Sequence, residues 1–91
     1  MSVVKAGAWT DLTTANSLAN GTSYLVQNRA KGVIVLLEED STAPTATDEA
    51  IALTPLGQEG NTTRFTQVDG MKLWGTCESG GAANVVVKAA S

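Results

Sequence analysis

The sequence contains no histidine, and this absence removes the side chain most often used as a general base or a metal ligand. The usual serine and cysteine triads depend on such a base and are excluded with it. The single cysteine, Cys77, cannot form an intrachain disulfide, and its place inside a predicted strand favours a small buried thiol. We therefore expect no enzyme and no cofactor.

Charge and long apolar runs are also scarce. Only 16% of the residues are charged, and the six basic residues are scattered singly, so no cluster can neutralise a run of phosphates. The longest aliphatic run, residues 33–37, falls far short of the ~20 residues that span a bilayer. The first residues lack the basic start and apolar stretch of a secretory signal. We expect a chain made in a cytoplasm that binds neither nucleic acid nor membranes.

Acidic residues are the only candidates for a metal site. Residues 38–40 and 48–49 are acidic and bracket a polar loop that contains Pro44. Their oxygens could ligate calcium, but the spacing matches no EF-hand, and a solvated acidic rim is the alternative. The sequence thus specifies no metal site.

What the sequence does contain is a series of short, alternating segments separated by turn signals. This pattern predicts an all-β fold, a small antiparallel sandwich or barrel. At most one short helical turn is expected, within residues 12–18, with Asp11 as its cap. Residues 8–91 would form a single domain preceded by a flexible arm, residues 1–7, which either frays or adds a strand to a neighbour's sheet. About seven strands are expected, near residues 8–12, 22–28, 33–39, 49–53, 62–68, 71–78 and 84–89.

Two turns are expected to close hairpins. Asp69-Gly70 is the preferred pair for a two-residue type I′ turn, and it separates two predicted strands. Residues 29–32 would form a tight hairpin loop in the same way.

The predicted strands carry more apolar side chains than one buried face of each sheet requires. Residues 33–37 place aliphatic groups on both faces of a strand, while Trp74 and Val86 fall on the polar faces of theirs. Either a loop of the chain or a partner covers such side chains, and we favour a partner. The predicted partner surface comprises Trp74, Val86, Ile34 and Leu36, with Trp9 and the arm as outer candidates.

Three segments carry a resemblance: Trp9-Thr10-Asp11-Leu12, residues 21–28 (GTSYLVQN) and Leu73-Trp74-Gly75. In these strings, and in its size and Thr/Gly/Ala-rich character, the chain resembles small all-β virion accessory proteins of tailed bacteriophages. The resemblance implies a non-enzymatic virion component that is made in the host bacterial cytoplasm. It further implies a self-associating protein, most often a homotrimer, that binds the major capsid protein or another virion protein and decorates the head.

Two other functions stay open. One is a carbohydrate- or receptor-binding module of a tail fibre or adhesin, for which Trp9, Tyr24 and Trp74 would be the stacking platform. The other is a tail-tube, baseplate or neck component, which needs the same kind of small self-associating β-domain.

Overall fold

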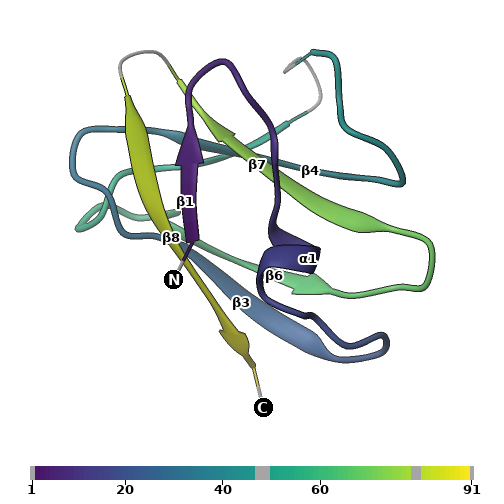
Figure 1. Ribbon diagram of the computed structural model, residues 1–91. Coiled ribbons are helices and arrows are strands. Elements are labelled where there is room, and N and C mark those ends of the chain that lie inside the picture. The colour runs from purple at the N-terminus through teal and green to yellow at the C-terminus, as the bar shows by residue number, and fades with distance from the viewer. Residues whose placement is uncertain (1, 47–49, 79–80, 91) are drawn as a thin grey trace.

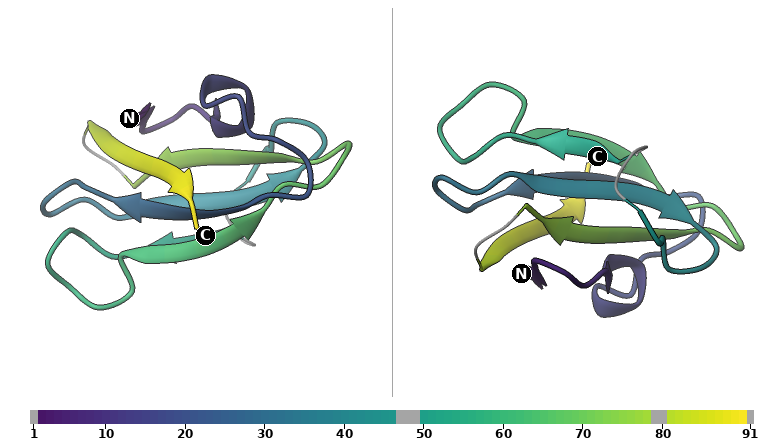
Figure 2. Two further views of the ribbon diagram at one scale, coloured as in Figure 1. Left: turned by 90° about the horizontal axis from the view of Figure 1, so that it is seen from below. Right: turned by 90° about the horizontal axis from the view of Figure 1, so that it is seen from above.

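The computed structural model describes residues 2–46, 50–78 and 81–90, which form two four-stranded antiparallel sheets packed on one another (Figure 1). The strand order is β1-β8-β3-β6 in the first sheet and β2-β7-β4-β5 in the second. Seen from below and from above, the strands of each sheet follow one another in this order (Figure 2). The predicted all-β sandwich is confirmed. Its elements are β1 (Ser2–Lys5), β2 (Thr10–Asp11), α1 (Leu12–Ala15), β3 (Ser23–Asn28), β4 (Val35–Asp40), β5 (Ile51–Leu53), β6 (Thr62–Thr66), β7 (Lys72–Cys77) and β8 (Ala82–Ala89).

The core lies between the sheets and is built from alternate residues of the strands. Val26 and Val85 point inward from the first sheet, and Val35 and Leu37 from the second, and each is at most 1% exposed. Strand alternation therefore places Leu25, Val86, Leu36 and Trp74 on outer faces, as the sequence pattern predicts.

Residues 2–5 differ from the expected arm, because they form β1 and belong to the domain. Ser2 to Lys5 pair in register with Val85 to Ala82 of β8 in the same chain. Val4 is fully buried in the core, and the Lys5 carbonyl accepts a hydrogen bond from the Thr76 hydroxyl at 2.8 Å. Burial of one valine and pairing along β8 hold this segment in place.

The two expected hairpins are wrong, because each turn joins the two sheets instead of neighbouring strands. β3 and β6 belong to the first sheet, whereas β4 and β7, which follow them in the chain, belong to the second. At the Asp69-Gly70 turn the Met71 N–H donates to the Val68 carbonyl at 3.1 Å, but only Gly70 has a positive φ, +83°. A type I′ turn needs positive φ at both central residues, so this turn does not match the twist of a hairpin.

The predicted helical turn is present and short. Asp11 caps α1 by accepting a hydrogen bond from the Thr14 N–H at 3.0 Å. The helix ends at Ala15, where the Asn16 side chain donates to the Leu12 carbonyl at 2.8 Å and Ser17 adopts φ +52°.

Candidate functional site

The structure separates the predicted partner residues onto the two outer faces of the sandwich. Trp74 pairs with Asp11 and Glu38 across the strands of the second sheet. Val86 pairs with Gln27 and lies on the outer face of the first sheet. Trp74 and Val86 therefore cannot contact one partner surface together.

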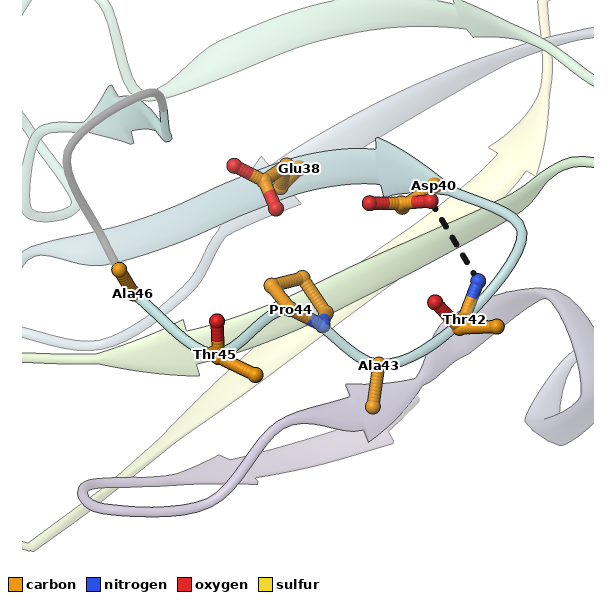
Figure 3. Close-up of a pocket in the computed structure, with 7 residues that line it drawn as sticks. All are labelled: Glu38, Asp40, Thr42, Ala43, Pro44, Thr45 and Ala46. Atoms are coloured by element: carbon orange, nitrogen blue, oxygen red, sulfur yellow. Dashed lines mark hydrogen bonds between the residues drawn. The ribbon is translucent and has the colours of Figure 1, made fainter.

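Trp74 is half-buried and lies beside the end of β4, from which a loop of its own chain starts. Its indole Nε1–H donates to the Asp40 carbonyl at 3.1 Å, where the loop after β4 begins. Pro44, in this loop, is buried, and residues 42–46 line a hollow with Glu38 and Asp40 (Figure 3). A loop cover is one of the two possibilities that the sequence left open for this side chain.

The other predicted residues are scattered around the second sheet. Leu36 is half-buried on its outer face, between Ala52 and Thr76. Ile34 precedes β4, and its carbonyl accepts the Glu78 N–H at 3.0 Å. Trp9 precedes β2 and is half-buried. Only one member of the run 33–37 therefore stands on the outer face of β4 itself.

The aromatic residues expected for a sugar platform do not share one sheet. Tyr24 lies in the first sheet opposite Phe65 and on the inward side of β3, with its hydroxyl accepting the Ala19 N–H at 2.8 Å. Trp74 points outward from the second sheet. Tyr24 and Trp74 thus cannot stack on the same ligand ring.

An apolar hollow on the outer face of the first sheet was not foreseen. It lies over the two central strands, β3 and β8, and has a volume of about 320 Å³. Leu25 and Val86 are its apolar members, and both are half-buried. Its other lining residues are polar or basic: Gln27, Arg29, Thr62 and Lys88. The alternation in residues 22–28 places Leu25 outside, but the sequence does not show that it neighbours Val86.

The two sheets carry opposite charge. The strands of the first sheet contain Lys5, Arg64 and Lys88 and no acidic residue. Those of the second contain Lys72 and four acidic residues, Asp11, Glu38, Glu39 and Asp40. Across the described ranges the one ion pair joins Lys72 Nζ to Asp11 Oδ2 at 3.3 Å. Single basic residues on separate strands thus gather on one sheet.

Asp11 and Cys77 have shifted acidities with clear causes. Partial burial acts to raise the pKa of Asp11, but hydrogen bonds from the Thr14 hydroxyl and N–H, together with Lys72, outweigh it and hold this pKa below its usual value. Burial raises the pKa of Cys77, which is 4% exposed, with its Sγ 3.4 Å from the Gly81 carbonyl. The prediction of a buried thiol is confirmed.

Acidic residues 38–40 form no metal cage with the rest of the described chain, where no group of three or more possible ligands comes together. The second acidic segment, residues 48–49, lies outside the described residues. Within the same described ranges, no helix has the length and hydrophobicity needed to cross a membrane.

The burial of two polar residues, Asn28 and Gln67, was not predicted from the sequence. Asn28 is 0% exposed, and its Nδ2 donates to the carbonyls of Val33, Leu53 and Thr54 at 2.8–3.2 Å. Gln67 is 3% exposed and holds the turn after β6. Each sits where the chain crosses between sheets, and a polar residue beside a turn gives no sequence signal for such burial.

Comparison with known proteins gives no relative. No protein-family model matches the chain, and neither a curated protein nor a solved structure matches it.

Proposed function

We propose that this chain is a structural virion protein of a tailed bacteriophage, which self-associates and decorates the capsid. The observation that carries the proposal is the half-buried apolar centre on the outer face of the first sheet. Leu25 and Val86 lie there on the two central strands and line one hollow, which no other strand or loop of the described chain closes. A partner that covers them would remove apolar surface from water at a gain of about 25 cal/mol per Å².

The resemblance of the segments around Trp9, Tyr24 and Trp74 to small phage proteins supplies the virion context. A protein that decorates a lattice binds more tightly when many copies are present, because many weak contacts act together when neighbouring copies are held in place. A sandwich of 91 residues with two outer sheet faces offers one surface for the lattice and another for its neighbours.

The first test is the mass of the protein in solution, by light scattering after size exclusion, over a range of concentrations. We expect a closed oligomer, and the resemblance points to a trimer. Val86→Asp should dissociate it, because a carboxylate would then occupy the apolar hollow. Val68→Asp is the matched control, since Val68 is 54% exposed in the turn after β6. A monomer at every concentration, together with no binding to capsids, would refute the proposal.

A second test concerns the lattice and uses Trp74→Ala. Reduced occupancy on capsid particles with an unchanged circular dichroism spectrum would place Trp74 in the lattice contact. Unchanged occupancy would mean that Trp74 makes contacts only within its own chain. Particle images would separate a head position from a tail or baseplate position.

A further inference from the structure

We infer that copies of this chain associate head to tail, with the first sheet of one copy placed against the acidic end of β4 in the next. This inference rests on the proposed self-association and specifies its surfaces. The two surfaces differ, so the contact is heterologous: it closes into a ring when the rotation between copies allows, and otherwise continues as a chain of copies.

The first surface, called here the basic face, is the outer side of the first sheet. Arg64 and Lys88 lie opposite Leu25 on the neighbouring strands, so two cations flank one apolar side chain. Arg29 and Lys88 border the hollow that Leu25 and Val86 line. A surface of this composition fits an aliphatic side chain accompanied by carboxylates.

The second surface, called here the acidic edge, consists of Glu38, Glu39 and Asp40 at the end of β4 together with Ile51. Within the described residues, β5 pairs only with residues 35–37 of β4, so residues 38–40 extend beyond Ile51–Leu53. Ile51 is 59% exposed and lines a shared hollow with the three acidic residues. The acidic edge therefore offers an exposed aliphatic side chain among carboxylates, which is the composition that the basic face fits.

Charge complementarity selects a second copy as the partner. The basic residues Arg29, Arg64 and Lys88 form no ion pair within the described residues, and neither do the acids of the acidic edge, although Arg64 lines one hollow with Glu38, Glu39 and Ile51 of its own chain. Pairing across copies would satisfy both sets. A standard interface buries about 800 Å² on each partner. This is roughly a sixth of the chain's 5048 Å² of accessible surface, so two such contacts fit on one copy.

The test is a pair of charge reversals, each made on the full chain. One variant carries Arg64→Glu with Lys88→Glu and turns the basic face acidic, and the other carries Glu38→Lys with Glu39→Lys and turns the acidic edge basic. Each alone places like charges in contact and should weaken self-association at least about tenfold. In an equimolar mixture every contact between the two variants joins opposite charges, so the mixture should associate to a larger mass than either variant alone, although a ring with an odd number of copies would still contain one contact between copies of the same variant. Assembly of the natural chain should also weaken as salt rises from 50 mM to 500 mM.

Lys31→Glu and Glu59→Lys are the matched controls, since both residues are exposed in loops outside the two surfaces. They should assemble like the natural chain. Circular dichroism confirms that each variant is folded. Folded variants that assemble normally, or a mixture that stays dissociated, would overturn the head-to-tail contact while leaving self-association intact. A natural chain that is monomeric at every concentration in low salt would overturn both.

Discussion

Gln67 and Thr13, which are 54 positions apart in the chain, are joined by a 2.8 Å hydrogen bond from the threonine hydroxyl to the glutamine side-chain oxygen. The same hydroxyl accepts the Leu73 N–H at 2.9 Å. The Gln67 amide donates to the carbonyls of Val68 and Met71 at 3.0 and 2.6 Å. These bonds tie α1 to the turn through which the chain leaves β6 in the first sheet and enters β7 in the second.

Gln67→Leu should therefore destabilise the fold by about 1–3 kcal/mol, because it leaves buried polar groups without partners. Gln58→Leu, in an exposed loop, should cost less than about 0.5 kcal/mol. Urea unfolding followed by tryptophan fluorescence measures both. Equal midpoints for the two variants would show that the Gln67 bonds contribute little.

Gly75→Ala should also destabilise, by about 1–3 kcal/mol. A Cβ atom at Gly75 would stand 3.0 Å from Val4 Cγ1 and 3.0 Å from Leu12 Cδ1, which is tighter than ordinary contact. Val4→Ala removes one of these neighbours, so the double variant should lose less stability than the two single losses added together. Thermal unfolding of the four proteins tests this, and strict additivity would contradict the overlap.

Stability should depend on pH through Asp11. Because its pKa is lower in the folded chain than in the unfolded one, its contribution is fully present above about pH 4 and is lost as pH falls through the folded value. Asp11→Asn keeps a capping oxygen but loses the ion pair with Lys72, so it should cost about 0.5–1 kcal/mol at pH 7. The difference from the natural chain should shrink as pH falls through the folded pKa.

Urea unfolding of the natural chain and Asp11→Asn between pH 2 and 7 measures this dependence. Glu59→Gln, which changes an exposed loop carboxylate, serves as the control and should differ little from the natural chain at any pH. A constant gap between Asp11→Asn and the natural chain across the range would show that the charge of Asp11 is not the cause.

Cys77 should react slowly with a disulfide reagent at pH 7.5, because the thiol is buried and its raised pKa keeps the thiolate scarce. β1 lies against this thiol, with the Val4 carbonyl 3.9 Å from Cys77 Sγ. Two adjacent valines of β1 provide a matched pair: Val4 is 0% exposed, whereas Val3 is 47% exposed. Val4→Ala should cost about 2 kcal/mol and speed the reaction severalfold by loosening β1. Val3→Ala should leave the rate unchanged, and a similar rise in both variants would exclude β1 as the cover.

The strands were predictable because alternation is a local property of the sequence. Trp74 falls on the expected outer face, Cys77 is buried as expected, and Asp11 caps the expected helical turn. The Asp69-Gly70 pair gave a wrong prediction of a hairpin, because it indicates only that these two residues favour a tight turn. Whether the following strand stays in the same sheet depends on buried contacts such as those of Gln67, which join residues far apart in sequence.

The candidate surface was harder to predict for the same reason. Leu25, Arg64 and Lys88 become neighbours only when β6, β3 and β8 pair, and no short segment of the sequence contains more than one of them. The surplus of apolar residues on outer faces was visible at Val86 and Leu36. Their distribution over opposite sides of the sandwich was not, because it depends on which sheet each strand joins.

The strand order also limits how this chain can fold. Within the described residues, β4 and β5 are the only consecutive strands that pair, and every other pairing joins strands distant in sequence. Contacts of this kind are typical of domains that fold in milliseconds to seconds. Since β1 pairs only with β8 among the strands of the described residues, β1 has no partner strand until β8 has been synthesised. The first sheet is therefore completed only once β8 is available, and until then Val4 lacks the strand against which its backbone pairs.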